Sequence, residues 1–447
     1  MKSTFLSLDR ACPRYTSYPA APHFTPDRGG LYPEWLQTIK DNAPVSIYVH
    51  IPFCAKMCLY CGCHTKITGR YAPVEDYVHW LRREIAMVAE TMKGRHLAAH
   101  IHFGGGSPTM LLPHDFRDIM KTIGTFFDMT SDTEIAIEID PRTLTQEKAD
   151  AYADTGVNRA SLGVQDANDD VLDAVERHQP FEQVMRGTQW LRERGIHKIN
   201  VDLMYGLPYQ TVRKMQRTID LVALLNPDRL ALFGYAHVPW MKKHMTLINE
   251  NALPDAGLRF DLQECARHEL VSAGYQAIGI DHFAKPDDPL TKAMKSKTMH
   301  RNFQGYTADD TDILIGFGVS SIGCMPQGYI QNNPNMPPYR DAIEAGVLPT
   351  YRGYQMTRDD HIRADVIEQI MCYFQVDLKT ISEKHHVPLS YFDNSIASVT
   401  QTLPDGTYEL CNSVLTLTVM PHLTARLCAH AFDAHAVHTE NRHARAI

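Results

Sequence analysis

The sequence predicts an α/β protein in which an extended N-terminal arm precedes a partial (β/α)6 barrel and a smaller, mainly helical C-terminal domain follows it. Two observations predict this fold. Between residues 44 and 273, six short apolar stretches with strand character alternate with segments of helical periodicity, an order typical of a parallel sheet with crossover helices. The unusual residues also come directly after the strands, and parallel α/β barrels place their active sites at that edge.

The predicted strands are short and rich in apolar residues, and they lie at residues 46–51, 98–103, 134–139, 159–164, 198–204 and 229–235. The segments between them repeat apolar residues every three to four positions, as amphipathic helices do. We expect these helices at residues 74–92, 114–127, 146–155, 181–194, 211–225 and 258–273. Right-handed crossovers between the strands would curl the sheet into a barrel or an open arc.

The pattern changes at both ends of the chain. Residues 1–40 are rich in Pro, Tyr, Ser and Thr and lack periodicity, which predicts an extended arm. We assign residues 41–345 to the barrel domain and its trailing connection. Residues 346–447 form the predicted C-terminal domain, with helices at 359–374 and 378–385 and a strand pair within 408–419.

Composition restricts the class of protein. With 447 residues, 44% hydrophobic and 21% charged, the chain can bury a large core. The net charge of −8 argues against wholesale nucleic-acid binding. No run of 18 apolar residues predicts a membrane span, and the N-terminus does not have the pattern of a signal peptide. Four of the ten cysteines lie between positions 54 and 63, which suits a reducing cytoplasm and one metal site.

The strongest motif is Cys54-x3-Cys58-x2-Cys61, which follows the first predicted strand. Three thiolates on one loop can bind three irons of a four-iron cluster and leave the fourth iron open for chemistry. A structural zinc site is the alternative, with Cys63 or His64 as its fourth ligand, but zinc sites usually draw a second ligand pair from a distant loop and none is present. For Cys63, both a functional role and a bystander role remain open.

Glycines and polar residues mark the ends of other predicted strands. Residues 104–106 are three glycines, which let the backbone approach a ligand closely, although such runs are often simple turns. Glu138 lies within an apolar strand, where ligand binding competes with a solvent-facing position. Asp202 could accept hydrogen bonds from ribose hydroxyls. Gln165 and Arg177 are similar candidates, and Arg177 taken alone could be an ordinary surface residue.

The cysteine spacing after a strand resembles that of the radical S-adenosylmethionine (SAM) superfamily. Further runs make the chain similar to one of its families, the oxygen-independent coproporphyrinogen III oxidases. The matching runs lie at residues 13–19, 48–63, 104–109, 138–142, 163–166, 202–208, 233–237, 281–288 and 300–307. The arm motif at 13–19, Cys63 and the run at 300–307 are more specific than the cysteine loop.

The resemblance implies a partial, TIM-like radical SAM barrel that holds a 4Fe-4S cluster, with Cys54, Cys58 and Cys61 as its ligands, and two molecules of SAM. The residues matching the site of the cluster-bound SAM are Tyr48, Gly105, Glu138 and Ile322. Those matching the second SAM site are Tyr60, Gly106, Ser107, Gln165, Arg177, Asp202 and Ala236. Cys63 is the candidate catalytic residue, and Arg14 matches an arginine proposed to meet a substrate propionate.

The implied reaction is oxidative decarboxylation of two propionates of coproporphyrinogen III to vinyl groups, by a 5′-deoxyadenosyl radical, in haem biosynthesis. A flavodoxin-type reductant, a monomeric state and a cytoplasmic location are expected. Two relatives are alternatives: a radical SAM haem chaperone and a haem-degrading radical SAM methyltransferase. Chaperones usually lack a cysteine at position 63 and the arm motif, and this chain has both. The similarity loosens after about Phe374, and the histidine-rich tail has no matching segment.

Overall fold

The computed structural model describes residues 2, 8 and 12–436, so His438 and His443 of the histidine-rich tail lie outside the described residues. Its main feature is a sheet in which six parallel strands lie side by side in chain order. These strands are β1 (Val45–Ile51), β4 (His96–Gly105), β6 (Glu134–Ile139), β7 (Arg159–Gln165), β8 (Lys198–Tyr205) and β9 (Arg229–Gly234). All six predicted strands are therefore present, and the partial-barrel prediction is confirmed.

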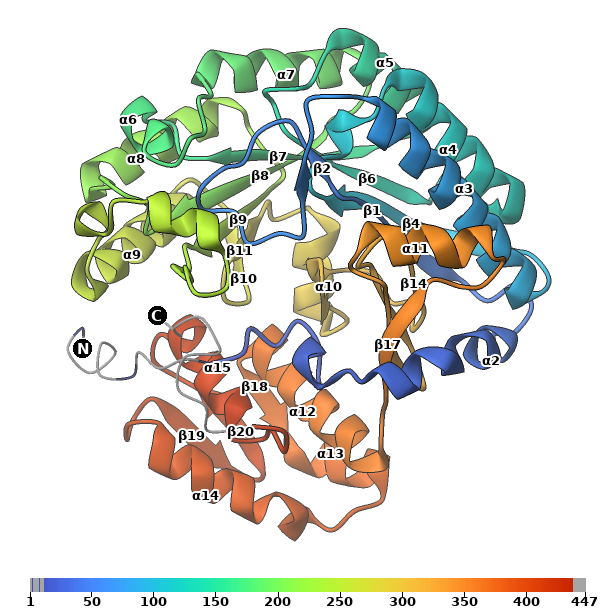
Figure 1. Ribbon diagram of the computed structural model, residues 1–447. Coiled ribbons are helices and arrows are strands. Elements are labelled where there is room, and N and C mark those ends of the chain that lie inside the picture. Colours follow the sequence, from blue (N-terminus) through green and yellow to red (C-terminus); the bar gives the residue numbers. More distant parts are fainter. Residues whose placement is uncertain (1, 3–7, 9–11, 437–447) are drawn as a thin grey trace.

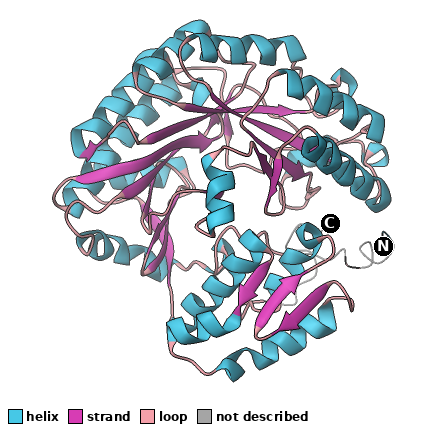
Figure 2. Ribbon diagram, turned by 180° about the vertical axis from the view of Figure 1, so that it is seen from behind, coloured by secondary structure: helices cyan, strands magenta, loops and turns pink. Residues whose placement is uncertain are grey.

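Six helices cover the outer face of this arc of strands (Figures 1 and 2). They are α3 (Ala72–Met92), α4 (Pro113–Phe126), α5 (Gln146–Asp154), α7 (Phe181–Glu193), α8 (Val212–Leu224) and α9 (Ala256–Ser272). Each lies within two residues of its predicted start and end. Side-chain caps fix several starts: Thr145, Thr211 and Asp255 each accept a hydrogen bond from a backbone N–H in the first turn. The apolar faces of strands and helices form one large core.

The sheet extends beyond the predicted strands at both edges. Next to β1 lies β14 (Leu314–Phe317), which is parallel to it, followed by antiparallel β15 (Ile322–Met325), β16 (Gly328–Asn332) and β17 (Thr350–Gln355). Next to β9 lie antiparallel β11 (His282–Ala284) and β10 (Gln276–Ile278). The sheet is therefore an open arc. These strands are three to six residues long, too short for the periodicity that the sequence analysis relied on.

Glu84 ties the extension to the barrel. This carboxylate of α3 is buried, and its Oε2 accepts hydrogen bonds from the Gly318 N–H at 2.7 Å and the Tyr339 hydroxyl at 2.6 Å. Burial raises the pKa of Glu84 to about 7, although these donors oppose the rise. Tyr339 belongs to α11 (Met336–Glu344). One buried carboxylate thus connects three segments that are distant in sequence.

The C-terminal domain has its own core. It contains α12 (Arg358–Tyr373), α13 (Leu378–His385), α14 (Asp393–Thr402) and α15 (Pro421–His430). The predicted strand pair is part of a three-stranded sheet of β18 (Gln375–Asp377), β20 (Val414–Leu417) and β19 (Tyr408–Cys411). Because β17 belongs to the main sheet although it lies past residue 346, we propose that this domain begins at α12.

The arm is more structured than its composition indicates. It includes η1 (Ala21–His23), η2 (Pro26–Leu31) and α2 (Tyr32–Gln37). Tyr15 and Tyr18 pack into the core of the C-terminal domain, while Tyr32 and Trp35 pack into that of the barrel. The arm therefore joins the two domains.

Short elements complete the described chain. They are β2 (Phe53–Cys54), β3 (Lys66–Ile67), η3 (Pro108–Met110), β5 (Phe127–Asp128), α6 (Asp169–Asp173), η4 (Lys243–Leu247), η5 (Glu250–Ala252), α10 (Pro289–Ser296), β12 (His300–Asn302), β13 (Gly305–Thr307) and η6 (Leu389–Phe392). Within the described residues, none of the helices combines the length and apolar character needed to cross a bilayer.

Candidate active site

The cysteine loop and the glycine loop are joined by backbone hydrogen bonds at the carboxyl ends of β1 and β4. The Gly106 N–H donates to the Ile51 carbonyl and the Ser107 N–H to the Phe53 carbonyl, both at 2.8 Å. A Cβ at position 106 would lie 2.8 Å from the Phe53 oxygen, so only glycine permits this approach. The structure thus brings the three glycines beside Cys54, which directly follows Phe53.

His50 fixes the far end of the cysteine loop. It is buried at the end of β1, and its Nε2 lies 3.1 Å from the His64 carbonyl oxygen. Burial lowers the pKa of His50 to about 4, so the ring is neutral at pH 7 and donates this hydrogen bond. A Cβ at Gly105, whose φ is +113°, would lie 2.5 Å from the His50 ring. The second glycine is therefore required by both its backbone angle and its neighbour.

Two arginines point at the thiol of Cys58. The Arg142 Nη2 lies 3.2 Å from the Cys58 Sγ and the Arg177 Nη1 lies 3.6 Å from it. Asp140 pairs with Arg142 at 2.7 Å and lies 3.7 Å from Arg177. The two guanidinium groups therefore place positive charge beside one of the three cysteines predicted to bind the cluster.

The other cysteines differ in environment. Burial raises the pKa of Cys54 to about 12. A hydrogen bond from Cys63 lowers the pKa of Cys61 to about 6, and the same bond raises that of Cys63. The structure therefore brings Cys63 next to Cys61, at the exposed side of the loop.

The donor set fits an iron–sulfur cluster better than a single zinc ion. Among the described residues, no three Cys, His, Asp or Glu side chains converge closely enough to hold one metal ion. Zinc would need four ligands within about 2.3 Å of one centre. A four-iron cluster distributes its thiolates over separate irons, so three thiols spread along one loop suit it. Arg142 and Arg177 supply positive charge where an anionic cluster would need it.

Glu138 lies beside the glycine loop. Its Oε2 accepts a hydrogen bond from the Gly105 N–H at 3.2 Å, and its Oε1 accepts one from the His102 Nε2 at 3.2 Å. The His102 ring stacks on Tyr48, with centroids 5.9 Å apart and planes at 19°. The Tyr48 hydroxyl lies 3.1 Å from the His50 Nδ1. Tyr48, Gly105 and Glu138, all predicted for one SAM site, therefore lie together in the structure.

Gln165 and Asp202 lie on the adjacent strands β7 and β8, and Arg177 follows α6. A Cβ added to Gly163 would lie 3.0 Å from the Gln165 Nε2 and 3.1 Å from the Arg177 Nη2, which places these two side chains together. Arg177 also donates to the Gln179 Oε1 at 2.9 Å. Burial raises the pKa of Asp202 to about 7, and the negative charge of Glu138 contributes to the rise.

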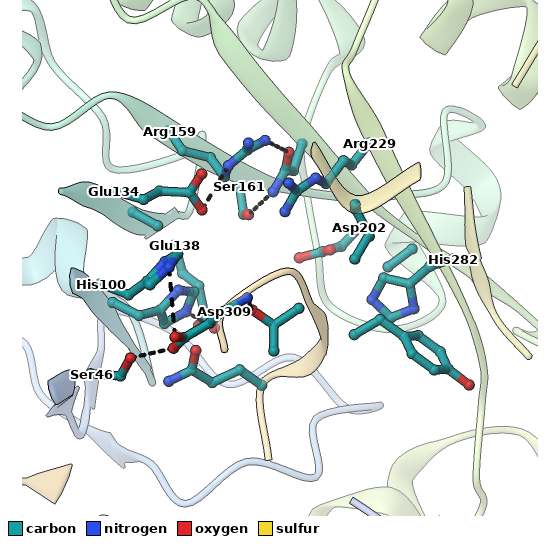
Figure 3. Close-up of a pocket in the computed structure, with 18 of the residues that line it drawn as sticks. Ser46, His100, Glu134, Glu138, Arg159, Ser161, Asp202, Arg229, His282 and Asp309 are labelled. Atoms are coloured by element: carbon teal, nitrogen blue, oxygen red, sulfur yellow. Dashed lines mark hydrogen bonds and ion pairs between the residues drawn. The ribbon is translucent and has the colours of Figure 1, made fainter. Parts of the chain in front are cut away.

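A polar cavity lies inside the barrel (Figure 3). The side chains that line this cavity include Glu138, Asp202, His102, His282 and Phe233. The lining side chains alternate along each strand with the residues that face the helices, as in any barrel. The predicted carboxylates Glu138 and Asp202 therefore share one cavity.

Charged residues at the first positions of three strands also line this cavity and form ion pairs. Arg159 Nε lies 3.0 Å from Glu134 Oε1, and Arg229 Nε lies 2.8 Å from Asp288 Oδ1. Burial raises the pKa of Glu134, but Arg159 and Arg229 outweigh it and lower the pKa to about 2. These charged side chains occupy positions inside the barrel that branched apolar residues commonly fill. The sequence contained an indication of these ion pairs, because three of the predicted strands begin with a charged residue, namely Glu134, Arg159 and Arg229.

The remaining predicted residues lie in other segments around the sheet. Ile322 begins β15, the strand next to β14, Ala236 follows β9, and Tyr60 lies between Cys58 and Cys61. The Arg14 Nη2 donates to the Gly234 carbonyl at the end of β9, at 3.3 Å. Ile322 and Ala236 are not among the residues that line the cavity as the described chain forms it.

Sequence reasoning missed three polar residues of the site: His50, His102 and Arg142. His50 and His102 were read only as parts of strands, and Arg142 only as the end of a matching run. A signal was available for His102, because it alternates in phase with His100 along an otherwise apolar strand and must therefore face inward.

The amino-acid sequence is similar to those of characterised protein families. Residues 48–222 match the radical SAM superfamily. The chain is 46% identical over 437 residues to an oxygen-independent coproporphyrinogen III oxidase from Bradyrhizobium diazoefficiens, with 97% of each chain covered. It is 39% identical to anaerobic coproporphyrinogen III oxidase 1 of Cereibacter sphaeroides, covering 96% of this chain and 95% of that protein.

A solved structure has the same fold. Coproporphyrinogen III oxidase from Escherichia coli, described as a radical SAM enzyme, superposes with a TM-score of 0.90 at 35% identity, covering 95% of this chain and 98% of that one. Membership of the superfamily implies a 4Fe-4S cluster and SAM. The chain belongs to the oxygen-independent coproporphyrinogen III oxidase family of radical SAM enzymes.

Proposed function

We propose that the protein converts two propionate side chains of coproporphyrinogen III to vinyl groups without oxygen and so forms protoporphyrinogen IX in haem biosynthesis. The observation that carries this proposal is the hydrogen-bonded junction of the cysteine and glycine loops beside a cavity that holds Glu138 and Asp202. When bound, the reduced cluster and SAM supply a 5′-deoxyadenosyl radical that removes a hydrogen atom from a propionate β-carbon. The substrate radical then loses CO2 and passes one electron to an external electron acceptor, which leaves the vinyl group.

In this proposal Cys54, Cys58 and Cys61 hold the cluster. Arg142 and Arg177 balance its charge at Cys58. The protein's own task is to orient the substrate and to exclude competing C–H bonds, since a primary alkyl radical attacks whichever carbon is nearest. Ion pairs lie at the end of the polar cavity where the strands begin. In this proposal, the large substrate enters from the opposite end, where the strands finish.

We further propose two SAM positions. Tyr48, Gly105, Glu138 and Ile322 would hold the SAM bound to the cluster. A second molecule would contact Tyr60, Gly106, Ser107, Gln165, Arg177, Asp202 and Ala236. The separation of Glu138 and Asp202 onto β6 and β8 supports two positions, because each carboxylate can serve a different ligand in the shared cavity.

Three further assignments remain predictions. A flavodoxin-type protein would reduce the cluster, the enzyme would act as a monomer, and it would work in the cytoplasm. The cytoplasmic assignment rests on the cysteine usage described above.

Anaerobic incubation of the reconstituted protein with coproporphyrinogen III, SAM and a reductant tests the function. We expect 5′-deoxyadenosine and vinyl products, identified by mass spectrometry. Stable haem binding without turnover would favour the chaperone, and methyl transfer from SAM with opening of the haem ring would favour the methyltransferase. Absence of iron and sulfide in oxygen-free preparations would contradict every radical SAM assignment.

A further inference from the structure

Buried neighbours hold the arm against the barrel rim and position Arg14. The Arg426 guanidinium donates from Nε to the Pro13 carbonyl at 3.1 Å and from Nη2 to the Cys12 carbonyl. Tyr15 is 5% exposed, and its hydroxyl donates to Asp433 at 3.0 Å. The Arg14 side chain between these anchors is exposed and reaches the Gly234 carbonyl. The arm therefore presents one guanidinium at the end of β9.

Two other arginines from distant segments meet Arg14 at the same rim. The Arg301 Nη2 of β12 donates to the backbone carbonyl of Arg14 at 3.4 Å. The Arg259 Nη1 of α9 donates to the Tyr235 carbonyl at 2.9 Å, one residue beyond the carbonyl that Arg14 contacts. Each of the three side chains approaches a backbone carbonyl, and a neutral carbonyl does not compensate a full positive charge.

Little negative charge balances this group. Among the described residues, Arg14 and Arg259 have no carboxylate within ion-pair distance, and Arg301 has only Asp281, 3.9 Å from its Nη1. Asp281 also accepts a hydrogen bond from the His282 Nδ1 at 2.6 Å. Burial raises the pKa of Asp281, but His282, Arg301 and Arg14 outweigh it and lower the pKa to about 2. Asp281 is thus the carboxylate that faces these guanidinium groups in the described chain, and the charge of Arg426 also acts on Arg14 and Arg301.

Arg301 also has buried N–H groups available. Its side chain is 5% exposed, and neither its Nε nor its Nη1 has a hydrogen-bond partner in the described chain. Unsatisfied buried donors on a charged group are costly, which points to a missing acceptor. The guanidinium lies 4.4 Å from the centre of the Tyr306 ring. Tyr306 and His282, the neighbour of Asp281, both line the barrel cavity, so the three arginines stand beside the proposed substrate position.

We propose that Arg14, Arg259 and Arg301 form a carboxylate receptor that binds the two propionates which the reaction leaves intact. This inference rests on the proposed function, because it takes coproporphyrinogen III as the substrate. Pairing a reacting carboxylate this strongly would stabilise the ground state against loss of CO2 and slow the reaction. Carboxylates that stay through both rounds are therefore the suitable partners for arginine forks.

Binding of oxidised porphyrins to the full-length reconstituted protein tests the receptor without turnover. Coproporphyrin III carries all four propionates, and protoporphyrin IX carries only the two retained ones. We expect Arg14→Gln and Arg259→Gln each to raise the dissociation constant of both porphyrins about tenfold, as loss of one charge-assisted pair does. Arg301→Lys, which keeps the charge and loses the fork, should have a smaller effect in the same direction. Arg186→Gln, an exposed change on α7, is the matched control.

Two results of these binding measurements would overturn the proposal. A loss of affinity for coproporphyrin III with none for protoporphyrin IX would show that the arginines hold the reacting propionates and would overturn the proposal. Unchanged affinity of both porphyrins for Arg14→Gln would also overturn it, because this exposed side chain can be removed without unfolding the protein, which circular dichroism can verify. If wild-type protein forms no vinyl product, the proposed function fails instead, and the two failures are thereby distinguished.

Discussion

The barrel mouth has two sides that are built differently. On the cluster side, the loops that follow the neighbouring strands β1 and β4 are joined by backbone hydrogen bonds. On the β9 side, Arg14, Arg259 and Arg301 come from three distant segments and meet through side chains. A radical reaction needs the first arrangement, because the generation of the radical tolerates little movement. Recognition of a large substrate can use parts from the whole chain.

The cluster side should be the more sensitive of the two to single changes. Replacement of Cys54, Cys58 or Cys61 by alanine removes one of only three thiolates, so we expect SAM cleavage to fall to background. Production of 5′-deoxyadenosine by anaerobically reconstituted protein measures this. Cys411→Ala, an exposed cysteine of the C-terminal domain, is the control. A triple-alanine variant that still produced 5′-deoxyadenosine would refute the site.

Replacement of Cys63 should distinguish formation of the radical from formation of the vinyl product. Cys63→Ala should retain the iron–sulfur absorption spectrum but lose vinyl formation. The thiol lies next to Cys61 and at the exposed side of the loop, where a substrate could reach it. Parallel assays of cluster content and vinyl product from one preparation measure the split. Full vinyl formation in this variant would make Cys63 a bystander.

His102 tests how far the cluster side depends on side chains. His102→Phe keeps a ring against Tyr48 but cannot donate to Glu138, whereas His102→Gln keeps a donor and loses the ring. We expect Phe to weaken SAM binding by about tenfold, the usual effect of losing a hydrogen bond to a charged group, and Gln to weaken it less. Equilibrium binding of SAM to reconstituted protein measures both. Weaker SAM binding by His102→Gln than by His102→Phe would indicate that the ring contributes through packing rather than through its hydrogen bond.

The smallest expected effect concerns Asp202 and pH. Its pKa in the folded protein is raised from 3.8 to about 7, so the folded state binds an extra proton between these values. The stabilisation from this proton is complete below about pH 4 and is lost as the pH rises through 7.

Asp202→Asn cannot lose that proton. The free energy of unfolding of the variant should therefore rise relative to that of wild type as the pH rises from 4 to 8. Urea unfolding of the two proteins at several pH values measures the difference. Opposing contributions from His102 and Arg177 are present in both proteins. A difference independent of pH would mean that Asp202 titrates normally.

Local sequence predicted the strands and helices that surround the cysteine and glycine loops. The six central strands and their helices follow from apolar periodicity, and the three cysteines and three glycines follow from spacing after strands. His102 and Arg142 were missed because one polar residue in a strand or turn has no pattern by itself. The strands from β10 to β17 were missed because they are short and depend on neighbouring strands rather than on periodicity.

The sequence by itself determined the parallel arc and the loops that carry cysteine and glycine, because these depend on residues close together in the chain. Only the tertiary structure decided which side chains from distant segments meet. It placed Arg301 on the backbone of Arg14, although 287 positions separate them. The physical reason is that periodicity and spacing encode local geometry, whereas the balance of charge at the β9 side exists only after segments far apart are packed together.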